Sequence, residues 1–171
     1  ALLEYCRGER EIPAWGISTA DYHEEGLGGE KLGNFPTVFL VKKKTRDEVL
    51  LALKQGRMYA CRSGNNFQRF VLQDFSVSDS NTNSQANMGD TLELNSKPEI
   101  RINVSSSDQS AHNVDVRIIR SGKLIRTISK TTPFAVDFKD DYFNPGELIY
   151  YRLEIPGKLV SNPIFVKFGR D

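Results

Sequence analysis

A carboxylate and an imidazole stand two residues apart near the start of the chain, in the stretch Ser18-Thr19-Ala20-Asp21-Tyr22-His23. In extended backbone, side chains at positions i and i+2 point to the same side, so Asp21 and His23 can converge on one or two cations. Carboxylate oxygen and imidazole nitrogen are the ligands that activate metal-bound water. The spacing therefore predicts a metal-ligand pair, with an exposed loop His beside an Asp as the alternative.

Other stretches carry weaker chemical signals. Gly26-Leu27-Gly28-Gly29, followed by Lys31 and Gly33, has the glycines of a phosphate-binding loop but not its Gly-Lys-Ser/Thr ending, so we interpret it as a flexible loop. Lys42-Lys43-Lys44 is typical of a solvated strand end. No nucleophile-elbow motif is present. The sequence therefore predicts no catalytic residue and no cofactor-binding residue of its own.

Aromatic, histidine and cysteine residues favour structural roles elsewhere. Tyr150-Tyr151 and Phe134/Phe138 could line a sugar site, but aromatic residues in strands more often fill the core. We expect His112 in a surface loop. Cys6 and Cys61 lie far apart and lack metal-ligand spacing, so we expect two free, part-buried thiols.

The charge balance excludes several classes of partner. The 171 residues carry 23 Lys+Arg and 22 Asp+Glu, a net charge of +1. A nucleic-acid or membrane-surface binder would need a basic excess, so we expect neither partner. No apolar run approaches the roughly 20 residues of a membrane-spanning helix.

The elements that must position Asp21 and His23 lie in residues 1–64, where helix and strand patterns alternate. Residues 2–7 predict a helix end capped by Gly8, residues 14–18 a buried strand, and residues 37–41 a second strand. Thr45-Arg46-Asp47-Glu48 matches a capping box, and the helix that it opens ends at Gly56. Residues 57–61 predict a third strand. This order indicates an α/β unit.

Residues 65–171 read as strand after strand. Apolar residues alternate over 100–104, 114–118, 134–138 and 149–155, Ser121-Gly122 predicts a hairpin turn, and residues 159–168 predict one last strand. Residues 76–87, rich in Ser, Asn and Asp, predict a mobile loop. About seven short strands indicate an antiparallel, immunoglobulin-like β-sandwich.

Taken together, residues 15–23, 37–41 and 45–59 resemble the C-terminal end of the PHP (polymerase and histidinol phosphatase) family. In that family an Asp-x-His metal motif follows a late barrel strand, and a strand, a helix and a strand with an aromatic residue complete the domain. Residues 161–166 resemble the last strand of the sandwich that follows the catalytic domain in many members. The resemblance covers most of residues 11–64 and, more loosely, the sandwich.

The resemblance implies a distorted (β/α)7 barrel that holds divalent Zn, Mn or Fe and hydrolyses phosphoesters, with Asp21 and His23 as the last two ligands. The family's opening His-x-His, its mid-barrel Glu and its further His ligands have no counterpart here. Two ligands do not close a metal site. We therefore expect an α+β chain: the C-terminal remnant of a PHP-type (β/α)7 barrel over residues 1–64, then the immunoglobulin-like β-sandwich over residues 65–171.

As a fragment, the chain would need the missing N-terminal barrel segment as its partner, would hold no metal stably, and would not hydrolyse a phosphoester alone. The alternative is a non-catalytic β-sandwich that serves as a binding module. Association of copies that completes the site in trans is a third interpretation. Substrate and metal identity do not follow from these residues; the lack of a signal pattern favours a soluble cytoplasmic protein.

Overall fold

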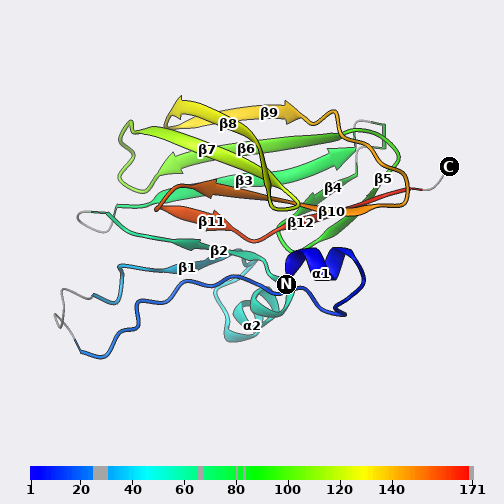
Figure 1. Ribbon diagram of the computed structural model, residues 1–171. Helices are drawn as coiled ribbons and strands as arrows, with labels where there is room; N and C mark the ends of the chain where they lie inside the picture. The colour runs from blue at the N-terminus through cyan, green and yellow to red at the C-terminus, as the bar shows by residue number, and fades with distance from the viewer. Residues whose placement is uncertain (25–30, 65–67, 80, 83, 170–171) are drawn as a thin grey trace.

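Strands with alternating apolar residues form two sheets that pack face to face in the computed structural model of the chain (Figure 1). The structure describes residues 1–24, 31–64, 68–79, 81–82 and 84–169. The smaller sheet has the order β4-β3-β6-β9, with bounds Gln85–Asn87, Phe70–Asp79, Pro98–Ser106 and Phe134–Lys139.

The larger sheet follows the order β1-β2-β11-β10-β12-β5, and β7 and then β8 continue from the other edge of β10. Its strands are β1 Thr37–Phe39, β2 Met58–Cys61, β5 Thr91–Leu94, β7 Asn113–Arg120, β8 Lys123–Thr131, β10 Leu148–Ile155, β11 Leu159–Ser161 and β12 Ile164–Phe168. The core lies between the two sheets, where every second side chain of β6 and β7 is buried.

The expected α+β fold with a remnant of a PHP-type (β/α)7 barrel is wrong. Successive strands of such a barrel are parallel, whereas β1 and β2, which flank the helix, pair antiparallel. β2 also pairs with β11, so it continues the sheet of the sandwich. Among the described residues the only parallel pair is β5 with β12. In its described part the chain is mostly antiparallel β, and the helices pack outside the larger sheet (Figure 1).

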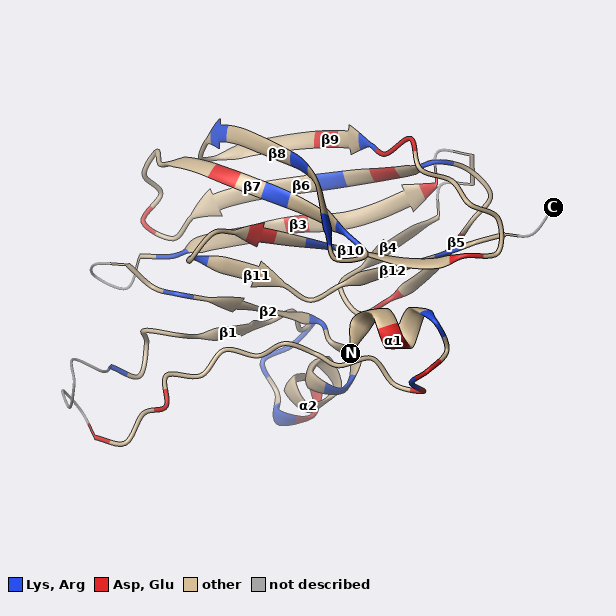
Figure 2. Cartoon of the chain, viewed as in Figure 1, with Lys and Arg blue, Asp and Glu red and all other residues tan. Residues whose placement is uncertain are grey.

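The boundary that we placed at residue 64 falls between β2 and β3, which belong to different sheets. Tyr59 and Cys61 of β2 lie in the same buried cluster as the residues of β3. Acidic and basic residues are interspersed over the strands of both sheets (Figure 2). Of the residues described, no helix is long and apolar enough to cross a membrane.

The described residues contain two helices, both before β2: α1, Leu2–Cys6, and α2, Arg46–Gln55. The Thr45 hydroxyl caps α2 by accepting from the Glu48 amide at 3.3 Å, as predicted. The Glu48 carboxylate, however, accepts from the Lys42 amide, not from that of Thr45, so only half of the capping box forms. Gly56, at φ +70°, ends the helix as predicted.

Three local predictions differ from the structure. Residues 14–18 form no strand. Residues 76–87, expected as a loop, contain the end of β3 and all of β4. The last predicted strand is two strands, because Asn162-Pro163 interrupts it and proline has no amide proton for a ladder. The predicted hairpin is confirmed: Ser121 and Gly122 have φ of +46° and +83°, as a type I′ turn requires.

Candidate metal site

The segment that leads to Asp21 and His23 is held to the sandwich by a side-chain amide. Asn162, buried in the break between β11 and β12, accepts a hydrogen bond from the Gly16 amide at 2.7 Å through Oδ1. Its Nδ2 donates to the Gly16 carbonyl at 3.1 Å. These two bonds replace the ladder bonds that a strand would make, which explains why residues 14–18 stay extended without joining the sheet.

Two further contacts fix the segment just before the ligand pair. Thr37 Oγ1 accepts from the Ser18 amide at 2.9 Å and donates to the Ser18 carbonyl at 3.0 Å. The Ser18 hydroxyl donates to the Cys61 carbonyl at 3.3 Å. Ser18 is therefore tied to both β1 and β2, three residues before Asp21.

Trp15 anchors the same segment to the end of α2. Its indole nitrogen donates to the Lys54 carbonyl at 3.0 Å. Its ring lies against Gly56, where a Cβ atom would stand 2.4 Å from ring carbons. Phe165 of β12 also packs near the ring, at 6.1 Å between centroids and a tilt of 57°. The glycine at this position thus ends the helix and makes room for the tryptophan.

Asp21 and His23 face each other beyond these anchors. His23 Nε2 lies 3.6 Å from Asp21 Oδ1, and the two side chains are 71% and 91% exposed, respectively. Asp21 is in the left-handed region, at φ +49°, which Asp tolerates better than most residues. The two side chains therefore lie together, as both interpretations of the spacing require, although the backbone that brings them together is not fully extended. Both side chains are open to a ligand approaching from solvent.

The donor types suit a divalent metal, but their number does not close a site. One carboxylate and one imidazole match the ligand preferences of Zn, Mn or Fe. Within the described ranges, no group of three or more His, Cys, Asp or Glu residues is placed to hold a metal ion. The pair can therefore supply only part of a coordination sphere, and the remaining ligands must come from outside the described residues.

His112, which we expected in a surface loop, belongs to a cluster that the sequence did not reveal. Its Nε2 lies 2.9 Å from Asp108 Oδ2, and the Ser106 hydroxyl donates to Asp108 Oδ1. Hydrogen bonds from Ser106 and the Ser110 amide lower the pKa of Asp108 to about 2. The carboxylate lies between the serine and the histidine, so the imidazole cannot take the serine proton as in a catalytic triad. The short spacing Ser-x-Asp-x-x-x-His is the sequence signal that could have predicted this cluster.

The remaining candidates take structural positions. Tyr151 and Tyr150 are buried, and Phe134 and Phe138 pack half-buried against the core, so the core interpretation is confirmed. Lys42–Lys44 are exposed, as expected. Gly26, Gly28 and Gly29 lie outside the described residues, whereas the Gly33 carbonyl accepts from the Ser63 hydroxyl at 2.6 Å.

Both cysteines are free, as predicted: Cys61 is buried and Cys6 half-buried. Burial raises the pKa of the Cys61 thiol to about 11. Burial, together with the nearby Glu147 carboxylate, raises the pKa of the Cys6 thiol to about 11 as well. Neither thiol is activated, because a nucleophilic cysteine needs a lowered pKa.

No known protein-family model matches the chain. A search of curated proteins finds no significant match either. The inference about function therefore starts from the geometry of the site.

Proposed function

We propose that this chain is the C-terminal part of a PHP-type metal-dependent phosphoesterase and that Asp21 and His23 supply two ligands to its divalent metals, Zn, Mn or Fe. The observation that carries the proposal is the convergence of a carboxylate and an imidazole, 3.6 Å apart and open to solvent, on an anchored segment. A bound divalent metal would supply Lewis-acid activation of the water that hydrolyses the phosphoester. Asp21 and His23 would orient that metal toward the substrate.

Because the chain supplies too few metal ligands, the proposal requires a partner. Because two donors do not close a metal site, the proposed partner is an N-terminal PHP barrel segment that carries the remaining ligands. In this arrangement residues 1–64 dock against a barrel without forming part of one. The chain alone then holds no metal tightly and does not turn over substrate.

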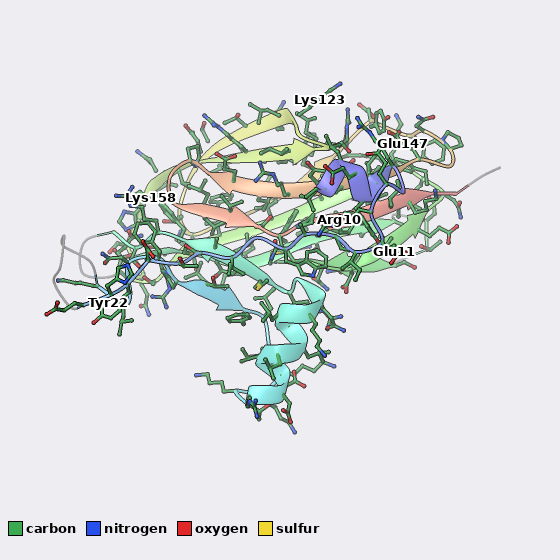
Figure 3. The ribbon with its side chains drawn as sticks, turned by 60° about the horizontal axis from the view of Figure 1, so that its bottom comes forward. Arg10, Glu11, Tyr22, Lys123, Glu147 and Lys158 are labelled. Carbon is green, nitrogen blue, oxygen red and sulfur yellow. The ribbon has the colours of Figure 1, made fainter. Side chains whose placement is uncertain are left out.

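Exposed apolar side chains in residues 1–64 support a docked partner. Of the ten large hydrophobic residues that are exposed in the described part of the chain, eight fall here: Leu3, Ile12, Ile17, Leu32, Leu40, Leu50, Leu51 and Leu53. Helix α2 projects from the body (Figure 3), and Ala52 is its only buried residue. Its three leucines are 40–45% exposed. A ten-residue helix depends on burying an apolar face, so we infer that a partner covers α2.

Complementation tests the proposal. The chain, mixed with or joined to the barrel segment of its own protein, is assayed with bis-p-nitrophenyl phosphate and Mn²⁺. We expect turnover only when both parts and the metal are present, and loss of turnover in Asp21→Asn and His23→Ala. Asp108→Asn removes a carboxylate that also faces a histidine and serves as the matched control. Turnover by the isolated chain, or full turnover in Asp21→Asn, would contradict the proposal.

The same exposed apolar side chains favour one alternative, a non-catalytic module that binds another protein. A module of this kind needs no metal ligand, so its complex would form equally well with Asp21→Asn/His23→Ala and would not depend on Mn²⁺. A second copy is a further occupant of this surface. Sedimentation of the chain with and without Mn²⁺ distinguishes self-association from a requirement for a different partner.

A further inference from the structure

A hollow of about 290 Å³ lies beside the anchored segment, between the end of β2 and the turn from β10 to β11. Its walls are mostly apolar, with two cations at the rim. Its accessible lining residues include Ser18, Phe35, Ala60, Arg62, Lys158 and Val160, whereas Cys61 and Leu159, which also border it, are buried in the core. No acidic side chain is among its described lining residues.

A backbone hydrogen bond joins the two residues that carry the cations, and a ring contact positions one of the cations. The Arg62 amide donates to the Lys158 carbonyl at 2.8 Å, which joins the end of β2 to the β10–β11 turn. The Arg62 guanidinium lies over the Phe35 ring, 5.7 Å from its centroid. Neither Arg62 nor Lys158 forms an ion pair with a carboxylate in the described part of the chain. Two uncompensated positive charges therefore stand at the edge of an apolar surface.

The hollow lies at the same end of the molecule as the metal-ligand pair. Ser18 lines it and precedes Asp21 by three residues. Figure 3 shows Lys158 and Tyr22, the residue between the two candidate ligands, at this end, away from α1 and Glu147. A molecule seated in the hollow would therefore lie against the segment that carries Asp21 and His23.

We propose that this hollow binds an anion that carries an apolar group, of the aryl phosphate class. Arg62 and Lys158 face the negative charge, and Phe35 and Val160 contact the ring. Guanidinium and ammonium groups are the side chains that bind phosphate oxygens. The apolar wall adds affinity in proportion to the ring area that it covers. That the bound ester is also the substrate rests on the proposed function; the binding itself requires no metal.

The composition of the hollow distinguishes this ligand from other anions. Inorganic phosphate would use the two cations but leave the apolar wall in water. A nucleic acid would need a continuous basic surface, which a net charge of +1 with interspersed acidic residues does not provide (Figure 2). A neutral aromatic alcohol would leave both cations without a partner.

A titration followed by ¹H–¹⁵N NMR, with metal removed by chelation, tests the site with phenyl phosphate, inorganic phosphate and phenol as separate probes. We expect phenyl phosphate to shift the amides of residues 61–62 and 157–160 and to bind about tenfold more tightly than phosphate or phenol. Lys158→Gln and Arg62→Ala should each weaken phenyl phosphate binding at least about threefold. Lys139→Gln, a cation on β9 that pairs with Glu99, should leave it unchanged.

Two results would overturn the inference: equal affinity for phenyl phosphate and inorganic phosphate, or unchanged affinity in Lys158→Gln. Arg62→Ala removes a ring contact as well as a charge, so the conservative Lys158→Gln keeps the test valid if Arg62→Ala unfolds. Asp21→Asn/His23→Ala should bind phenyl phosphate as the original chain does. If this double variant loses metal binding but still binds phenyl phosphate, the binding hollow is shown to be independent of the proposed catalytic function.

Discussion

Asn162 Oδ1 and Nδ2 bind the amide and the carbonyl of Gly16, at 2.7 and 3.1 Å, and so join two segments from opposite ends of the chain. Asn162 stands in the sandwich, whereas Gly16 stands in the segment that carries the candidate metal ligands. The sandwich therefore helps to position that segment, and it is more than an appended domain.

Asn162→Ala should lower the free energy of unfolding by about 2 kcal/mol, because it leaves the Gly16 amide and carbonyl without their buried partner. Urea denaturation measures the loss. Asn144→Ala is the control, since Asn144 is exposed and its amide donates to Glu147 at 3.0 Å; it should cost less than about 0.5 kcal/mol. Equal losses in the two variants would show that the Asn162 clamp does not hold the segment.

Gly56→Ala should displace Trp15, because a Cβ atom there would lie 2.4 Å from the indole ring. Gly157→Ala is a matched control: Gly157 has a similar φ, +67° against +70°, but nothing lies within 4 Å of its Cβ position. Backbone strain should lower the free energy of unfolding of each variant by about 1 kcal/mol. In Gly56→Ala the clash with Trp15 should lower it further and shift the fluorescence emission of Trp15, the single tryptophan, to longer wavelength. An unshifted emission would contradict the packing of Trp15 on Gly56.

Asp140→Asn should be the most destabilising charge removal. The buried Asp140 carboxylate accepts two bonds from Arg120, at 2.9 and 2.7 Å, and one from the Tyr151 hydroxyl at 2.7 Å. Removing one partner of such a pair leaves the other charge uncompensated, at a cost of about 3 kcal/mol. The neighbouring Asp141→Asn breaks an exposed pair with Lys97 and should cost less than about 1 kcal/mol. Thermal unfolding measures the destabilisation of both variants. A larger loss in Asp141→Asn than in Asp140→Asn would contradict the stabilising role of the hydrogen bonds among Asp140, Arg120 and Tyr151.

The two thiols should make the stability of the fold decline in alkali. Their folded-state pKa values are about 11, against 9.0 for an ordinary thiol. A raised pKa means that burial favours the neutral form, so this contribution is complete below pH 9 and is lost as the pH rises from 9 through 11. Unfolding midpoints of Cys61→Ala and of the original chain, measured at pH 8, 9.5 and 11, should converge as the pH rises. A difference that stays constant over this range would refute the assignment.

Much of the sandwich could be predicted from the sequence, because a strand with one buried face has an apolar residue at every second position. Ile100, Ile102 and Val104 gave β6 in this way, and they are fully buried. The ends of α2 could also be predicted, because Thr45 and Gly56 cap the helix through hydrogen bonds to residues a few positions away. Local rules succeed where the interaction is local.

The failures have long-range causes. Ala14–Ser18 is apolar like a strand, but its hydrogen bonds go to the Asn162 side chain, which no local pattern reveals. The barrel interpretation failed because β2 pairs with β11, a partner from the far end of the chain. Asp21 and His23 were found because they are neighbours in sequence. Arg62 and Lys158 were missed because only the fold brings them together.

A Mn²⁺ titration of the chain, observed by ¹H–¹⁵N NMR, tests the central claim that Asp21 and His23 ligate a divalent metal. We expect the amides of residues 21–23 to broaden first, at millimolar Mn²⁺ because only two ligands are present, and Asp21→Asn/His23→Ala to abolish this broadening. Asp108 and His112 are the internal reference: hydrogen bonds already occupy their facing atoms, so their amides should broaden later. Sharp resonances at residues 21–23 while those of residues 108–112 broaden would contradict the account.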